Sequence, residues 1–169
     1  MKLPRPKLSS RMVSFLEHAL KNQPLWDVCC DHGYVGIKAM ESGAFSEVHF
    51  VDQVPHIMDR LETLISQTRI AKNHRHFLHR KAGEELEAEI HGTLLIAGVG
   101  GLTIKNILEN LIAKKALKAK RFLLSPHSDE KVLLNLLESE SFQQHYDITQ
   151  KILLPEGPRH RPLYIIDLR

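Results

Sequence analysis

The sequence predicts an α/β fold with a doubly wound sheet of seven strands, mostly parallel with the last strand antiparallel, and helices on both faces. Short apolar strand patterns alternate with helical periodicity between residues 25 and 137. Two more strand patterns then follow with only a short loop between them, which predicts antiparallel pairing. The chain has 169 residues, 43% of them hydrophobic, which suits one domain over 1–169, with an N-terminal helical segment (1–23) and a core (24–169).

The first half of the chain is expected to hold three helices and three strands. Ser9 or Ser10 is the expected cap of the first helix, which ends before Pro24. Gly43 is the expected stop of the second helix, and Pro55 the first residue of the third. The expected elements are a helix from residue 10, a strand over 25–29, a helix over 34–42, a strand over 48–52, a helix from 55 and a strand over 75–79.

The second half continues this alternation. Ser128 is the expected cap of its last helix. The expected elements are a strand over 93–97, a glycine-rich turn over 98–101, a helix over 102–112, a strand over 121–125, a helix from 129, and strands over about 146–154 and 163–168 around a hairpin loop at 155–161.

Composition excludes some classes of protein and leaves others open. Lys and Arg number 23 against 20 Asp and Glu, so the net charge of +3 permits a polyanionic partner without requiring one. The two cysteines, Cys29 and Cys30, are adjacent, which favours a reducing cytosol. The sequence lacks a signal-peptide pattern and an apolar run of about 20 residues, so we expect a soluble, cytoplasmic protein without a membrane segment. His74 and His76 have no acidic or cysteine partners nearby in the sequence, and no metal is expected.

Acidic residues follow the first two strands, where an open parallel sheet binds its ligand. The first strand leads into Asp27-Val-Cys-Cys-Asp31-His32-Gly33-Tyr34, and the second ends at Asp52. Gly33 and Asp52 are 19 residues apart, the spacing at which a carboxylate accepts hydrogen bonds from ribose hydroxyls. The alternative is that Asp27 and Asp31 only cap a turn and a helix.

The first loop disfavours a dinucleotide. It lacks Gly-x-Gly-x-x-Gly, and the Asp31 carboxylate would repel a pyrophosphate. S-adenosylmethionine suits an acidic loop better, since it carries adenosine and a cationic sulfonium but no phosphate. A nucleotide-dependent oxidoreductase is therefore a distant alternative.

Several motifs, in this order, resemble those of bacterial tRNA (adenine-22, N1)-methyltransferases, the TrmK-like group. The family begins with Leu-Ser-x-Arg-Leu and continues with Asp-Ile-Gly-Ser-Asp-His-(Gly/Ala)-Tyr, Gly-Asp-Gly-Leu, Ile-Ala-Gly-Met-Gly-Gly and a Gln-Pro-Asn-like turn. The corresponding segments here are Leu8-Ser-Ser-Arg11-Met12, residues 27–34, Gly83-Glu84-Glu85-Leu86, Ile96-Ala97-Gly98-Val-Gly-Gly101 and Ser125-Pro-His127.

The resemblance implies a Rossmann-like class I methyltransferase with S-adenosylmethionine as cofactor and tRNA as the expected partner. It implies cofactor-binding roles for Asp27, Asp31 and Gly33 at the methionine part, Asp52 at the ribose, Gln53 and Glu84 at the adenine, Ala97 and Gly98 at the transfer site, and Arg11 where it closes the pocket or meets the substrate.

An adenine N1 has an in-plane lone pair, so methylation needs orientation rather than prior deprotonation. Asp31 is the first candidate to stabilise the developing positive charge, with His32 and Tyr34 as helpers. Tyr34 or His127 is the candidate to stack on an unstacked base. The candidates for phosphate contacts are Arg159 and Arg161 in the predicted hairpin loop, with Arg11.

Departures from the family pattern leave two alternatives open. The printed sequence ends at Arg169 without the family's C-terminal helical segment, which favours a methyltransferase for a small molecule or a protein as the second hypothesis. Cys29 in place of glycine, and Glu84-Glu85 in place of Asp-Gly, favour a non-catalytic RNA-binding relative as the third. The oligomeric state is not predicted.

Overall fold

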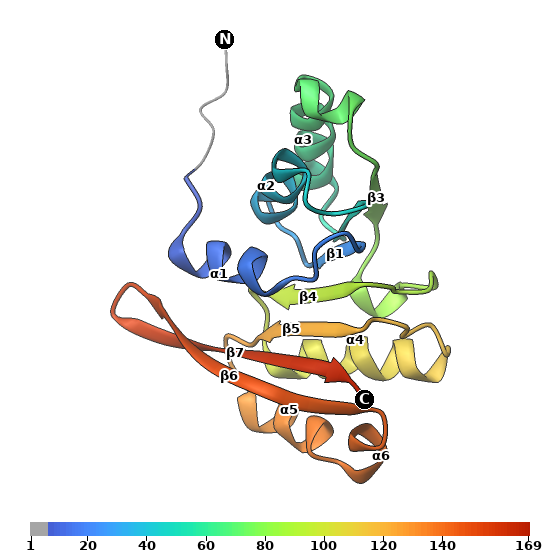
Figure 1. Ribbon diagram of the computed structural model, residues 1–169, viewed down its shortest axis with the longest axis vertical. Coiled ribbons are helices and arrows are strands. Elements are labelled where there is room, and N and C mark those ends of the chain that lie inside the picture. Colours follow the sequence, from blue (N-terminus) through green and yellow to red (C-terminus); the bar gives the residue numbers. More distant parts are fainter. Residues whose placement is uncertain (1–6) are drawn as a thin grey trace.

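The computed structural model describes residues 7–169 and holds a seven-stranded sheet in the order β3-β2-β1-β4-β5-β7-β6 (Figure 1). β7 (Arg159–Leu168) pairs antiparallel with both β5 (Arg121–Ser125) and β6 (Tyr146–Glu156), and the other pairings are parallel. The predicted fold class is confirmed. Residues 1–6 of the predicted N-terminal segment lie outside the described residues.

The first half of the chain follows its prediction closely. Ser9 caps the first helix by accepting a hydrogen bond from the Met12 N–H (3.2 Å), Gly43 ends the second with a left-handed backbone, and Pro55 begins the third. The elements are α1 (Ser10–His18), β1 (Leu25–Val28), α2 (Tyr34–Ser42), β2 (Val48–Asp52), α3 (Pro55–Ser66), the short 3₁₀ helix η1 (Arg69–Lys72) and β3 (His76–Arg80).

The second half corrects the prediction for the cap of α5. Asp129, with a left-handed backbone (φ 52°), precedes this helix, and the Ser128 hydroxyl donates to the Asp129 carboxylate (3.0 Å) instead of accepting from a helical N–H. The elements before the final hairpin are the 3₁₀ helix η2 (Gly83–Glu85), β4 (Thr93–Ala97), α4 (Gly101–Ala113), β5, α5 (Glu130–Leu137) and α6 (Glu140–Gln143).

The hairpin loop predicted over 155–161 is wrong, because β6 extends to Glu156 and β7 begins at Arg159. Gly157, with φ 57°, takes the first position of a two-residue turn, where a positive φ is needed. Pro155 is tolerated because β6 is an edge strand. Arg159 and Arg161 therefore lie on a strand and not in a loop.

Two apolar layers hold helices against opposite faces of the sheet. On one face α1, α2 and α3 pack with residues such as Leu25 and Phe50, and on the other α4, α5 and α6 pack with Trp26 and Phe122. In Figure 1 α2 and α3 lie beside the upper strands, α1 lies at the level of β1 and β4, and α4, α5 and α6 lie beside the lower strands. Neighbouring residues Leu25 and Trp26 face opposite layers, as the two-residue period of a strand requires.

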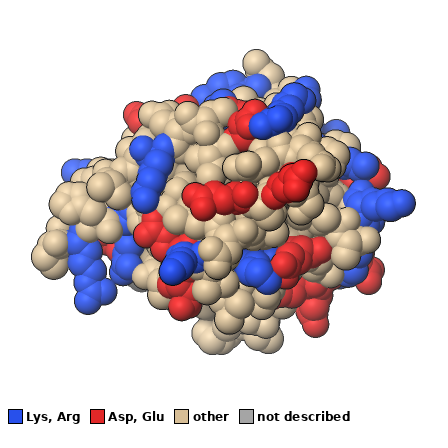
Figure 2. Space-filling view, turned by 90° about the horizontal axis from the view of Figure 1, so that it is seen from below, with Lys and Arg blue, Asp and Glu red and all other residues tan. Residues whose placement is uncertain are grey.

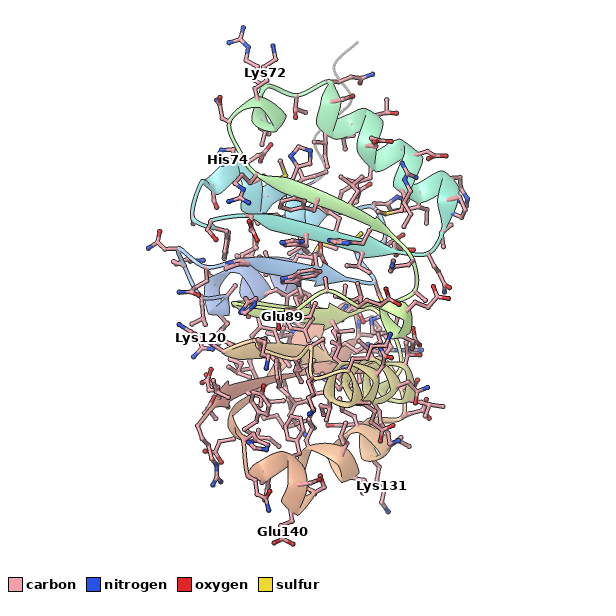
Figure 3. All side chains as sticks on the ribbon, turned by 90° about the vertical axis from the view of Figure 1, so that its right-hand side faces the viewer. Lys72, His74, Glu89, Lys120, Lys131 and Glu140 are labelled. Atoms are coloured by element: carbon pink, nitrogen blue, oxygen red, sulfur yellow. The ribbon has the colours of Figure 1, made fainter. Side chains whose placement is uncertain are left out.

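The outer part of one sheet face carries stacked rings. Trp26 stacks on His49 (3.7 Å between ring centroids) and His49 on Phe77 (4.7 Å). Among the described residues no helix crosses in front of these strands in Figure 3. His49 Nε2 lies 3.0 Å from Glu47 Oε1, and its Nδ1 lies 3.0 Å from His79 Nε2. The Glu47 carboxylate requires a hydrogen on His49 Nε2, so the His79 Nε2–H donates to His49 Nδ1.

This histidine pair predicts a loss of stability in acid. Burial, with the charges of His49 and Lys81, lowers the pKa of His79 to about 4. Between this pKa and the unfolded value of about 6.5, His79 is neutral in the folded protein but charged in the unfolded chain. The contribution of neutral His79 to the free energy of unfolding is fully present above pH 6.5. It is lost as the pH drops toward 4, and the loss is about 1–2 kcal/mol between pH 7 and pH 5. Urea unfolding of the native chain and His79→Gln at these two pH values checks this. An equal acid loss in both proteins would contradict it.

Candidate functional site

The loop between β1 and α2 folds back tightly at the carboxyl end of the sheet. Cys29, Asp31 and Gly33 all have left-handed backbones (φ 59°, 52° and 71°). A Cβ at Gly33 would lie 2.7 Å from Leu61 Cδ1, so the loop needs glycine there both for its backbone and for its approach to α3. The Gly33 N–H donates to the Cys30 carbonyl (2.8 Å), which closes the turn before α2.

Asp52 joins this loop to the end of β2. Its Oδ2 accepts from the Asp31 N–H (3.0 Å) and its Oδ1 from the Val54 N–H (3.0 Å). A carboxylate offers about four acceptor positions, so about two remain for a ligand. The predicted proximity of the first loop and Asp52 is thus present in the structure.

Asp27 lies beneath the loop, and its side chain is buried within β1. Its Oδ2 accepts from the Gly36 N–H in the first turn of α2 (3.2 Å), so the capping alternative also describes part of its role. Burial first, and then the charges of Asp52 and Asp31, raise the pKa of Asp27 to about 7.

Glu84 adds a further carboxylate from η2. Burial, together with the charges of Asp52, Glu84 and Asp27, raises the pKa of the Cys29 thiol to about 12. These acids therefore act on the same loop although they come from three elements. The result is a negative electrostatic field at the carboxyl ends of β1 and β2, which favours a cationic ligand over a phosphate.

The remaining predicted cofactor residues lie at the surface, at the same carboxyl ends of the parallel strands. Gln53 is exposed, and the Asp31 side chain is 68% exposed, with its Oδ1 3.8 Å from His32 Nε2. The His32 and Tyr34 rings stack with centroids 5.4 Å apart. Gly98, after half-buried Ala97, has a left-handed backbone (φ 79°) and open space where a Cβ would project.

A second polar group lies beyond the end of β5, and we call it the Glu156 cluster: Arg11, Ser125, His127, Glu156 and Arg161. The Arg11 Nη1 donates to Glu156 Oε1 (2.9 Å), and its Nη2 donates to Ser125 Oγ (3.2 Å). The Arg161 Nε donates to Glu156 Oε2 (2.6 Å), and its Nη1 donates to the His127 carbonyl (2.7 Å).

This cluster regroups the predicted residues. Arg11 contacts Glu156 and Ser125, so it belongs with His127 and Arg161 and not with the Asp52 loop. Arg159 is exposed at the tip of the hairpin, in register with Glu156. Sequence reasoning missed Glu156. The available signal was a single acidic residue three positions before a run of three basic ones in the segment 156–161.

The two groups meet through the glycine turn after β4. Ala97 pairs with Ser125 across β4 and β5, the His127 N–H donates to the Val99 carbonyl (2.9 Å), and the Gly101 N–H donates to the Ser128 carbonyl (2.7 Å). Because β4 lies between β1 and β5 in the sheet, the acidic loop after β1 and the Glu156 cluster at β5 lie on either side of this turn. Within the described part of the chain, no group of three or more His, Cys, Asp or Glu residues forms a metal site. No helix there is long and apolar enough to span a membrane.

The doubly wound sheet with a reversed β7, and the carboxylates at the carboxyl ends of β1 and β2, agree with the expected Rossmann-like methyltransferase fold. The methyltransferase domain family matches residues 8–160, so the chain belongs to this family. This membership confirms the predicted enzyme class, an S-adenosylmethionine-dependent methyltransferase. No curated protein matches the chain.

Solved structures show the same fold at low sequence identity. The Bacillus subtilis m1A22 tRNA methyltransferase TrmK superposes with a TM-score of 0.81 at 18% identity over 95% of this chain and 66% of that one. TrmK of M. capricolum, in complex with S-adenosylhomocysteine, gives a TM-score of 0.78 at 18% identity over 95% of this chain and 68% of that one. An uncharacterised protein from Listeria monocytogenes gives 0.80 at 20% over 95% and 68%. This chain spans about two thirds of each of these structures.

Proposed function

We propose that this protein transfers the methyl group of S-adenosylmethionine to adenine N1 in a tRNA. The observation that carries the proposal is the placement of an acidic loop and a basic cluster on either side of one glycine turn. The acidic side suits a cationic cofactor, and the basic side suits a phosphate-bearing acceptor. The likeness to TrmK structures supports the same substrate class.

The residues of the acidic side fit the cofactor by their donors and acceptors. The free lone pairs of Asp52 suit two vicinal ribose hydroxyls, and Glu84 suits the adenine amino group. Asp27 and Asp31 supply negative charge for the sulfonium and amino groups. When bound, S-adenosylmethionine supplies an electrophilic methyl group.

The acceptor side then has to orient a base and tolerate its positive charge. Open space at Gly98 leaves room for a base at the end of β4. The exposed Asp31 carboxylate stabilises the charge that N1 methylation creates, and His32 and Tyr34 present stacked rings beside it. Arg11 and Arg161 supply positive charge for the backbone of the acceptor. Burial and the charges of these two arginines lower the pKa of His127, so its ring is neutral and adds no charge.

Local rather than overall charge has to attract an RNA to this chain. The net charge is only +3, and the face seen in Figure 2 has basic and acidic residues interspersed. Charge concentrated in the Glu156 cluster therefore carries the electrostatic part of the proposal. The supporting argument is that its two guanidinium groups, from Arg11 and Arg161, share one carboxylate.

Transfer of radiolabelled methyl groups to bulk unmodified tRNA tests the proposed acceptor. We expect label in the RNA with the native chain and none with Asp52→Ala. Binding of tRNA without transfer would favour a non-catalytic RNA-binding relative. Cofactor binding without either tRNA binding or tRNA labelling would favour a small-molecule or protein acceptor.

The pKa of Asp27 predicts the pH dependence of cofactor binding. Because this pKa is raised to about 7, the carboxyl is largely protonated at pH 6 and ionised at pH 8. A cationic cofactor binds the ionised form better, so its affinity should rise about tenfold or less between these pH values. Calorimetry with S-adenosylmethionine checks this, and Asp27→Asn should flatten the profile. A native profile as flat as that of the variant would contradict the linkage.

A further inference from the structure

Glu156 lies on the solvent side of the cluster that it holds together. Its side chain is 38% exposed, whereas those of Arg11 and Arg161 are 11% and 17% exposed. Each of its carboxylate oxygens accepts from a different guanidinium group. An anion that approaches either arginine from solvent therefore meets Glu156 first.

We propose that Glu156 occupies a phosphate site formed by Arg11 and Arg161 and gives way to a phosphate group of the acceptor. The inference rests on the proposed function, because it concerns the acceptor side of that site. The Glu156 carboxylate thus neutralises the positive charge of the two guanidinium groups until another anion replaces it.

Replacement of one anion by another keeps the buried charge compensated. Arg11 is buried, and a buried guanidinium without an anion is strongly unfavourable. A phosphate offers the same paired oxygens as a carboxylate, and guanidinium groups bind both in the same geometry. No proton or covalent bond has to change in this exchange.

The hairpin allows this movement with a small rearrangement. The backbone of Glu156 is fixed by its pairing with Arg159 in β7, so only its side chain has to rotate toward solvent. The Ser125 hydroxyl still holds Arg11, and the His127 carbonyl still holds Arg161. The two guanidinium groups thus keep their places when the carboxylate leaves.

Two nitrogen atoms at the cluster remain without a partner. Arg11 Nε and His127 Nε2 are both buried and make no hydrogen bond in the structure. His127 Nε2 lies 4.0 Å from Glu156 Oε1, beyond hydrogen-bond distance. Arg11 Nε always carries a hydrogen, and buried donors are usually satisfied, so the cluster has capacity for at least one more acceptor atom than the carboxylate provides.

Inorganic phosphate is the probe for the test, measured by thermal unfolding at constant ionic strength. Glu156→Gln is compared with the native chain and with Asp147→Asn, which makes the same charge change at the other end of β6, where Asp147 pairs with Arg169. We expect Glu156→Gln to bind phosphate about three- to tenfold more tightly than the other two proteins, since it removes a competing anion. Equal or weaker binding by Glu156→Gln would overturn the proposal.

Arg161→Gln provides a second comparison if Glu156→Gln does not fold. Phosphate should bind this variant about tenfold less tightly than the native chain, because the site loses one guanidinium group. Unchanged phosphate binding would overturn the proposal. Binding of tRNA to the native chain is measured in parallel. Failure there, with the expected phosphate results, would remove tRNA as the acceptor and leave the anion exchange in place.

Discussion

Asp52→Ala is expected to weaken binding of S-adenosylhomocysteine by at least about 100-fold, because hydrogen bonds to a charged group contribute about 1.5–3 kcal/mol each and two ribose hydroxyls would lose theirs. The same carboxylate accepts the backbone N–H groups of Asp31 and Val54, so the variant also loosens the first loop. Titration calorimetry measures the affinity directly.

Asp59→Ala is the matched control for this substitution. Asp59 lies nearby on α3, but it faces solvent and pairs with Arg80 (2.6 Å), so its removal should leave the affinity unchanged within about twofold. Thermal unfolding of both variants separates loss of binding from loss of structure. Undiminished affinity in a folded Asp52→Ala protein would remove Asp52 from the cofactor site.

Gly36→Ala is expected to lower the free energy of unfolding by about 2–3 kcal/mol, the upper part of the range of about 1–3 kcal/mol that is usual for overpacking a core. A Cβ at this position would lie 2.2 Å from Phe50 Cε1, and the Phe50 ring is fully buried. This cost outweighs the gain of up to about 1 kcal/mol that alanine brings to a helix. The melting temperature should fall by about 4–12 °C.

Lys38→Ala is the control, because it also introduces an alanine into α2 but at an exposed position. It should change the free energy of unfolding by less than about 0.5 kcal/mol. The comparison also bears on the site, because the Gly36 N–H donates to Asp27. An alanine that pushes α2 away from β2 would lengthen that bond. A Gly36→Ala protein as stable as the native chain would contradict the close packing of α2 against Phe50.

The strands and long helices were predictable because their apolar periodicity has one interpretation. Thr93–Ala97 and Arg121–Ser125 are short apolar runs between helices, and both are strands as predicted. The strand expected over 75–79 is displaced by one residue, to His76–Arg80. The short elements η1, η2 and α6 were missed, since three or four residues carry no periodicity.

The antiparallel hairpin was predicted, but its loop was predicted too long because Pro155 and Pro162 usually interrupt strands. Pro155 lies on an edge strand, and Pro162 lies in the part of β7 beyond its pairing with β5, which ends at Tyr164. Neither proline removes a hydrogen bond that the sheet needs there. Edge position depends on strand order, which the local sequence does not contain.

The acidic half of the site was predictable because it follows from the order of the strands. Asp27 and Asp52 lie near the carboxyl ends of neighbouring parallel strands, and Asp31 lies in the loop after the first, so strand order brings them together. The basic half depends on tertiary contacts between residues more than 110 positions apart, such as Arg11 with Ser125 and Glu156. The sequence therefore indicated the basic residues but not the carboxylate that joins them.

Mass spectrometry of nucleosides tests the central claim most directly. An unmodified tRNA mixture is incubated with the native chain and with S-adenosylmethionine that carries an isotopically labelled methyl group, and is then digested. We predict labelled 1-methyladenosine with the native chain and none with Asp52→Ala. A native chain that binds S-adenosylhomocysteine and yet leaves every nucleoside unlabelled would contradict the claim.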